Sequence, residues 1–145
     1  MFTFFKCKVR YQKMLETGME KTVTEEYLVD SLSWSEAEKK ITEEMEAFIS
    51  GEFSISDISR FKVSETFLSD KGDRYFKAKL HFITLDEKSG SEKKQSVYAL
   101  VQADEIGEAK EIIEREMKKT MIDYEIPEIK ETKILDVFTY QGDGY

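Results

Sequence analysis

The sequence is poor in the residues from which most catalytic and metal sites are built. It holds one cysteine, Cys7, one histidine, His81, and one proline, Pro127, in 145 residues. A single cysteine excludes an internal disulfide and favours a reducing, cytoplasmic setting. One cysteine and one histidine also argue against a zinc site. The seven glycines are scattered and form no phosphate-binding loop, so we expect neither a cofactor nor a metal.

Long hydrophobic runs are missing as well. No apolar stretch approaches the roughly 18 residues that span a bilayer, and the chain reaches Lys6 too early for a signal peptide. We therefore expect no membrane association. Apolar residues make up 40% and charged residues 36% of the chain, which is typical of a globular protein, and we expect a single domain over residues 1–145. The net charge of −8 disfavours unspecific attraction to nucleic acid but leaves room for a local basic patch.

An internal duplication is the strongest pattern in the sequence. Residues 5–11 align with 76–82 at an offset of 71, and Gly18 meets Gly90 at an offset of 72. Further matches keep their order along the chain to Phe67 and Phe138, where the offset is again 71. We therefore predict two tandem repeats, over residues 1–70 and 74–145.

Each repeat predicts two strands, one helix and a third strand. Strands are expected at 5–11, 23–31 and 57–67 in the first repeat, and at 76–82, 95–103 and 127–140 in the second, with Pro127 at the start of the last one. Turns are expected at Gly18 and Gly90. Ser33 and Glu36 form a capping box for the first helix, Gly51 is a plausible stop, and Asp104 or Glu105 begins the second helix. Apolar residues recur at helical spacing at Trp34, Ala37, Ile41, Met45 and Phe48, and at Ile106, Ala109, Ile113 and Met117.

Together the repeats predict the fold class. One helix covers too little of a sheet alone, so two ββαβ repeats side by side should share a core. We expect an α+β domain with a two-layer, antiparallel-rich sheet of six strands, two helices on one face and pseudo-twofold symmetry.

Four segments resemble an uncharacterised family. These are residues 27–30 (YLVD), 35–38 (SEAE), 49–53 (ISGEF) and 82–90 (FITLDEKSG). They are similar to a domain-of-unknown-function family found in Bacteroidetes bacteria and their phages. The resemblance covers essentially the whole chain. It implies a small cytoplasmic protein that often travels with phage or mobile-element genes, and it implies no activity and no functional residues.

No motif for catalysis is present, so we expect no enzyme. His81 lies on the outward phase of its strand, where a solvated surface residue is expected, and Cys7 lies on the apolar phase as a small core residue. Glu65 and Asp136 are possible inward acids, because both share the strand phase of apolar neighbours and recur at the same place in each repeat. A strand-end acid at the sheet margin is the simpler interpretation of both.

The strand phase also predicts a basic sheet face. If the helices cover the apolar phase, nine cations share the opposite face with His81, against only Glu26 and Glu131. The nine cations are Lys6, Lys8, Arg10, Arg60, Lys62, Lys77, Lys79, Lys94 and Lys133. Such a face could contact nucleic acid or another polyanion. Only Tyr98 could stack on a base, and strand lysines are also ordinary solvated residues that discourage edge pairing.

Three functional hypotheses remain open at this point. The first is a non-catalytic protein whose basic sheet face contacts nucleic acid or another polyanion. The second is a protein–protein adaptor, in one or two copies, which predicts an exposed apolar patch near Trp34 or Phe53. The third is an enzyme with a site between the repeats, which would need Glu65 or Asp136 beside a cation in a pocket.

Overall fold

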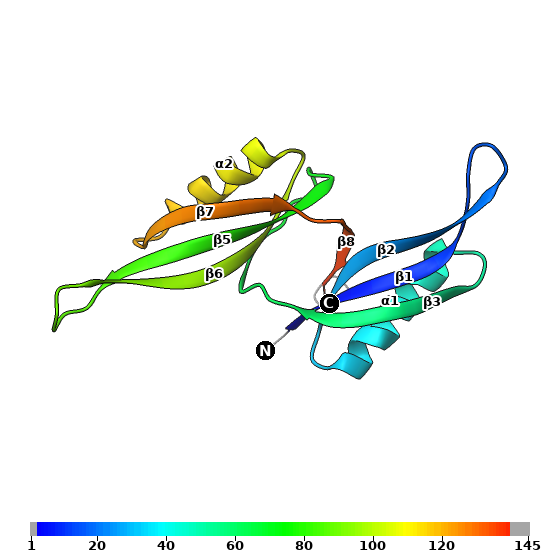
Figure 1. The fold of residues 1–145 in the computed structure, drawn as a ribbon, viewed down its shortest axis with the longest axis horizontal. Coiled ribbons are helices and arrows are strands. Elements are labelled where there is room, and N and C mark those ends of the chain that lie inside the picture. Colours follow the sequence, from blue (N-terminus) through cyan, green and yellow to red (C-terminus); the bar gives the residue numbers. More distant parts are fainter. Residues whose placement is uncertain (1–2, 140–145) are drawn as a thin grey trace. The chain divides into compact units, whose positions relative to one another are not determined.

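The computed structural model describes residues 3–139 as an α+β fold with eight strands and two helices (Figure 1). Backbone contacts divide the chain into two compact units. Unit 1 comprises Met1–Lys62 and Lys133–Tyr145, and unit 2 comprises Val63–Thr132. The expected end of the last strand at residue 140 lies outside the described residues. The unit boundaries differ from the expected repeat boundaries, because the last segment of each expected repeat belongs to the other unit: residues 63–70 to unit 2, and residues from 133 onward to unit 1.

Unit 1 is a four-stranded sheet with one helix. Its elements are β1 (Thr3–Met14), β2 (Glu20–Ser31), α1 (Trp34–Phe48), β3 (Phe53–Phe61) and β8 (Ile134–Phe138). The strand order is β3-β1-β2-β8. β1 is antiparallel to both β2 and β3, whereas β8 runs parallel to β2, so the sheet is mixed.

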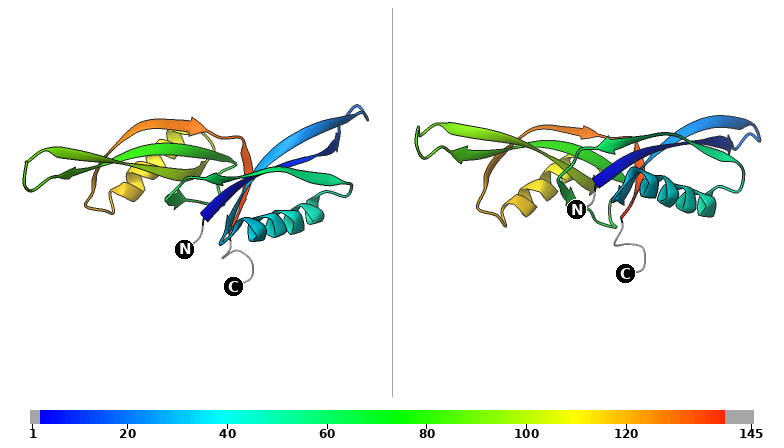
Figure 2. Two further views of the ribbon diagram at one scale, coloured as in Figure 1. Left: turned by 60° about the horizontal axis from the view of Figure 1, so that its bottom comes forward. Right: turned by 90° about the horizontal axis from the view of Figure 1, so that it is seen from below.

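Unit 2 has the corresponding set of elements. They are β4 (Glu65–Phe67), β5 (Arg74–Leu85), β6 (Glu92–Ala103), α2 (Ile106–Met117) and β7 (Asp123–Glu131). The strand order is β4-β6-β5-β7, in which short β4 runs parallel to β6. Written in the opposite direction, the order β7-β5-β6-β4 corresponds to β3-β1-β2-β8 in unit 1. Figure 2 shows one helix against one face of each sheet.

Two expectations about the sheets are wrong. There are two four-stranded sheets instead of one with six strands, and each half of the chain has a fourth, short strand. The expected strand at 57–67 is in fact the end of β3 followed by β4, and the one at 127–140 is the end of β7 followed by β8. The breaks at 62–64 and 132–133 contain neither glycine nor proline, so they carry no turn signal.

Each unit has its own apolar core between sheet and helix. In unit 1, Phe5, Cys7 and Val9 of β1 pack with Ala37, Ile41 and Met45 of α1. In unit 2, the core is formed by Phe76, Ala78 and Leu80 of β5 with Ala109, Ile113 and Met117 of α2. These side chains alternate along the strand and recur at helical spacing, as the sequence predicts. The expected core shared by both repeats is therefore replaced by two cores, one in each unit.

The local signals at turns and helix ends are mostly confirmed. Gly18 and Gly90 have positive φ angles of 86° and 70°, which a turn between antiparallel strands requires there. The Ser33 Oγ accepts the Glu36 N–H at 3.2 Å, and Glu105 is the N-cap of α2 without a side-chain capping bond. Gly51 is not a left-handed helix stop, because α1 ends at Phe48 and its C-cap, Ile49, is extended.

Candidate binding surfaces

The strand registers assign each predicted cation to a face. Residues directly opposite each other in an antiparallel pair share a face, and Phe5, Val9, Phe76 and Leu80 face the helices. The alternate residues therefore lie on the helix-free face of their own sheet. By this register the helix-free faces carry Lys6, Lys8, Arg10, Lys77, Lys79, Lys94 and His81.

Three predicted cations do not lie on that face. Arg60 is opposite Phe5, which puts its side chain on the helix side of unit 1. Lys62 and Lys133 follow the ends of β3 and β7 and belong to no strand. The phase of β3 is set by buried Ile58, opposite Cys7, and not by Phe61, which lies opposite Phe4 on the helix-free face. Glu131 is likewise on the helix side, opposite Phe76.

Acids lie beside several of the remaining cations. In unit 1, the Lys6 Nζ is 3.5 Å from the Glu26 carboxylate, and Lys8 lies between Glu26 and Asp57. In unit 2, Lys79 lies opposite Glu128. The alternation of the sequence did not place Asp57 and Glu128 on this face, because a β-bulge beside each of them shifts the alternation. The helix-free faces are therefore mixed in charge instead of uniformly basic.

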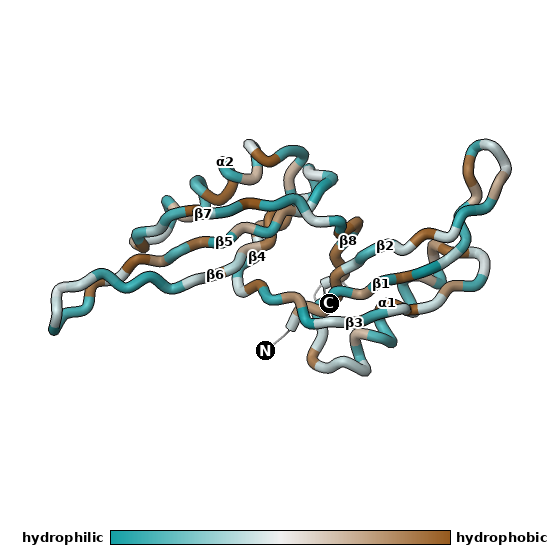
Figure 3. The backbone as a smooth tube through the Cα atoms, viewed as in Figure 1, coloured by the Kyte–Doolittle hydropathy of each residue, from teal (hydrophilic) through white to brown (hydrophobic). Residues whose placement is uncertain are grey.

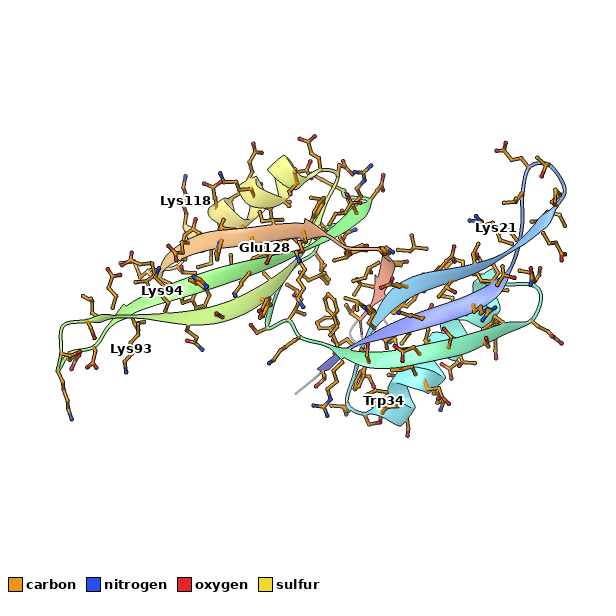
Figure 4. The ribbon with its side chains drawn as sticks, in the orientation of Figure 1. Lys21, Trp34, Lys93, Lys94, Lys118 and Glu128 are labelled. Atoms are coloured by element: carbon orange, nitrogen blue, oxygen red, sulfur yellow. The ribbon has the colours of Figure 1, made fainter. Side chains whose placement is uncertain are left out.

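The clearest charge cluster centres on Glu125 in unit 2. Its carboxylate lies 3.0 Å from His81 Nδ1 and 2.9 Å from Lys94 Nζ. Figure 4 labels Lys94 on β6. Hydrogen bonds from these two side chains lower the pKa of Glu125, and the same contact raises the pKa of Lys94. His81 is thus not a freely solvated residue, since only 22% of its side chain is exposed. The cluster therefore pairs one of the nine predicted cations, Lys94, with an acid.

Tyr98, the aromatic side chain that the sequence offered for base stacking, already has a contact on its ring. Lys77 Nζ lies 4.8 Å from the centre of the Tyr98 ring, in a cation–π contact. Apolar residues also interrupt the polar row, since Leu28 and Leu100, opposite Lys6 and Lys77, are fully buried. A base could not stack on Tyr98 without displacing Lys77.

The two predicted inward acids differ in their surroundings. Glu65 lies opposite Ala99 and Asp136 opposite Tyr27, so both are on the helix side of their sheets, as predicted. Glu65 is nevertheless exposed at the sheet margin. The Asp136 carboxylate is half-buried and accepts the Val137 N–H at 2.8 Å. Neither lines the cavities described below.

A hydrogen-bonded cluster of two tyrosines and Glu25 in unit 1 was not predicted. Tyr11 and Tyr27 both donate hydrogen bonds to the same Glu25 oxygen, at 2.9 and 3.0 Å, and Lys13 lies 3.8 Å from the other oxygen. Burial and the Glu25 carboxylate raise the pKa of both phenols. By register the equivalent positions in unit 2 are apolar, namely Phe82, Val97 and Ala99. Both phenols donate, so the group needs no ligand to satisfy it.

Cys7 is a core residue. It is fully buried, and burial together with the nearby Asp57 carboxylate raises the pKa of its thiol to about 12. We predict that a thiol-specific reagent at pH 8 modifies Cys7 only through unfolding, since thiolate is the reactive form. The rate of modification should rise with urea in parallel with the unfolded fraction. Rapid modification of the native protein would contradict this placement.

The clearest difference between the units is at their hairpin ends. β1 and β2 extend beyond Tyr11, where pairing with β3 ends, so residues 12–22 form a two-stranded arm. We call residues 14–19 tip 1 and the equivalent residues 85–91 of unit 2 tip 2. Three large apolar side chains of tip 1 are exposed, Met14 by 64%, Leu15 by 40% and Met19 by 68%. Figure 3 shows this hydrophobic segment at the end of the β1–β2 hairpin.

Tip 1 also has a defined backbone. The Leu15 N–H donates to the Met19 carbonyl at 2.8 Å, and the Gly18 N–H donates to the Leu15 carbonyl at 2.9 Å. Tip 2 is closed by a similar pair of bonds between Asp86, Ser91 and Gly90, but its side chains are polar apart from Leu85. Exposed Trp34, by contrast, packs its ring edge against Phe5, and Phe53 is half-buried. Leu32 and Phe48 near Trp34 are exposed as well, but tip 1 differs in that its three apolar side chains share one closed turn.

Two cavities lie within single units. One, of about 290 Å³, is in unit 2 between α2 and the segment after β4, lined by Phe67, Leu68 and Ile112 together with polar side chains that include Gln102 and Arg115. The other, of about 300 Å³, is a shallow hollow where the arm leaves the sheet of unit 1, lined by Arg10, Gln12 and Glu52 among others. Across residues 3–139, no three His, Cys, Asp or Glu side chains are grouped as metal ligands. Within the same span, no helix has the length and apolar character to cross a bilayer.

Comparison with known proteins yields one match. A family model described as Domain of unknown function (DUF4494) matches residues 3–140. No curated protein and no solved structure is similar to the chain.

Proposed function

The chain belongs to the DUF4494 family. We propose that it is a non-catalytic protein-interaction module whose contact surface is tip 1. One observation carries the proposal. Met14, Leu15 and Met19 stand exposed together at the end of an arm whose backbone is fixed by hydrogen bonds. Exposed apolar clusters of this kind mark protein contacts, and methionine adapts well to a partner surface.

The fixed backbone of tip 1 favours binding. A loop that is already closed loses less conformational entropy when a partner covers it. Burial of each large apolar side chain contributes about 1.5–3 kcal/mol. Three such side chains can therefore act as the centre of an interface, with the charged arm residues Lys13, Glu16 and Lys21 around them.

We further infer that the two halves of the chain, β1–β4 and β5–β8, are copies of one duplicated ββαββ segment. The corresponding strand orders support this, as do the equivalent bulges beside Asp57 in β3 and Glu128 in β7. Each copy contributes its last strand to the sheet of the other. The duplication leaves tip 2 as a natural reference, because it has the same backbone role with different side chains.

Nucleic acid or another polyanion is the second candidate. The observation that favours it is the placement of Lys77 directly opposite Lys130 in unit 2, since like charges facing each other are a cost unless something neutralises them. Lys130 also lies 3.0 Å from Glu128, and Lys77 contacts Tyr98, so both charges have a nearby partner. Protein contact through tip 1 is therefore better supported.

The family resemblance adds a setting for the proposal. On the strength of this resemblance we propose that the protein acts in the cytoplasm of Bacteroidetes bacteria, in a phage or mobile-element setting. A host or phage protein is then the expected partner of tip 1.

A comparison of three immobilised proteins tests the proposal. They are the wild type, the tip 1 variant M14S/L15S/M19S, and the tip 2 variant L85S/E87S/K88S as a matched control. We expect a protein from the source cells to be retained by the wild type and the control, and retention by the tip 1 variant to fall at least about tenfold. The replaced side chains are exposed, so all three proteins should have the same melting temperature.

Salt separates the two candidates in the same experiment. Retention through apolar contacts should persist at about 1 M salt, where charges interact only over about 3 Å. Polyanion binding should be lost there, because the logarithm of the binding constant falls linearly with the logarithm of the salt concentration. Equal retention by the tip 1 and tip 2 variants, or retention that disappears with salt, would show that tip 1 is not the contact surface.

A further inference from the structure

β3 is an edge strand of the unit 1 sheet. Among the described strands it pairs only with β1, so one side of its nine-residue backbone carries hydrogen-bonding groups that no strand accepts or supplies. The equivalent edge of unit 2 is β7, which pairs only with β5 in the described structure. The two edges have the same length and the same register, including the bulge. Their side chains can therefore be compared position by position.

β7 has features that prevent strand addition. Pro127 stands at the bulge and lacks an N–H group, and Lys130 lies three residues further on. The strand also carries four acids and one base. Two copies of β7 side by side would bring acids against acids.

β3 lacks each of these features. The position of Pro127 is taken by Ser56 and that of Lys130 by Ser59, according to the shared register. β3 carries one acid, Asp57, and one base, Arg60, so two copies do not repel. Its serines are small enough for another strand to approach closely. The half-buried side chains of Phe53 and Ile55 next to this edge would gain cover from a neighbouring sheet.

We propose that β3 is a self-pairing edge through which two copies of this chain associate, with the two β3 strands antiparallel. A twofold axis near Ser59 or Ile58 sets the two β3 strands opposite each other over most of their length. The arrangement is closed, because the same strand serves both copies, and it joins two four-stranded sheets into one. A contact of one strand from each copy is small, so the dimer is weak and its population depends on concentration.

Sedimentation velocity of the wild type and three variants tests the proposal. The first variant, S56P/S59K, gives β3 the residues of β7. The second, S54K/S59K, adds two charges without proline and serves if the first does not fold. The matched control, T24K, adds one charge to exposed Thr24 on β2, which is an interior strand. Far-ultraviolet circular dichroism checks the fold of each protein.

We expect the wild type and T24K to shift from monomer to dimer as concentration rises to about 1 mM, a range that detects weak pairs. S54K/S59K and folded S56P/S59K should remain monomeric over the same range. A wild type that stays monomeric throughout overturns the proposal. So does a dimer that forms equally well in folded β3 variants, because another surface would then hold the copies together.

Discussion

Replacing Gly72 by alanine should lower the free energy of unfolding of unit 2 by about 3 kcal/mol, the upper part of the range for overpacked sites. A Cβ atom on Gly72 would lie 2.6 Å from the backbone nitrogen of Ala103 and 2.7 Å from its Cα. Ala103 is fully buried at the end of β6, so the strand itself would have to move. The Gln102 Nε2 donates to the Gly72 carbonyl at 2.8 Å, which holds the loop against the strand.

Gly51 provides the matched control for this substitution. No atom lies within 4 Å of a Cβ added there, and its φ is not positive. Gly51→Ala should therefore leave stability unchanged or raise it by up to about 1 kcal/mol. Urea unfolding followed by circular dichroism measures both variants. Similar losses in the two variants would mean that the contact between Gly72 and β6 is not as close as described.

Ending the chain after Thr132 should unfold unit 1 while unit 2 keeps its structure. The change removes β8, which covers the edge of β2 along Glu26–Val29. It also removes nearly buried Ile134 and the Phe138 ring, whose centre lies 5.8 Å from that of Tyr27 in a stacked pair. Loss of two large apolar side chains from a core costs several kcal/mol, about the total stability of a small domain.

Hydrogen exchange resolved by peptide measures this effect in each unit separately. We expect amides of β1, β2 and β3 to lose protection and those of β5, β6 and β7 to keep it. The double variant E65A/F67A supplies the mirror control, since β4 pairs with β6 in unit 2. It should reduce protection in unit 2 only. Loss of protection in β5–β7 after truncation would contradict the assignment of β8 to unit 1.

Local features of the fold could be predicted from the sequence. The alternation of β1, the helical spacing at Ala37, Ile41 and Met45, and the turn at Gly18 each depend on neighbouring residues. The separation of β3 from β4 could not, because residues 62–64 continue the apolar alternation and contain no turn residue. The pairing of β8 with β2 joins residues about a hundred positions apart, and no local pattern specifies such a contact.

The candidate surfaces, too, could be predicted only where they depend on local sequence. The faces of Lys6, Lys8 and Lys77 follow from strict alternation and were predicted. The acids near the cations were not predicted, for two reasons. Bulges beside Asp57 and Glu128 change which side of the strand each following residue faces. The position of His81 beside Glu125 depends on pairing between β5 and β7, which the sequence does not specify. Tip 1 did carry a signal. Three large apolar residues flank the turn at Gly18, where the aligned turn of the second repeat is mostly polar.

The most direct test of the account places a photoreactive phenylalanine analogue at tip 1 in living cells. It replaces Met19, whose side chain is 68% exposed, and in a parallel strain it replaces Lys88 at tip 2, which is also exposed. Light should join the first protein to a partner in a discrete covalent product and leave the second protein unjoined. Products of equal yield at both tips, or none at tip 1, would contradict the proposal that tip 1 is the contact surface.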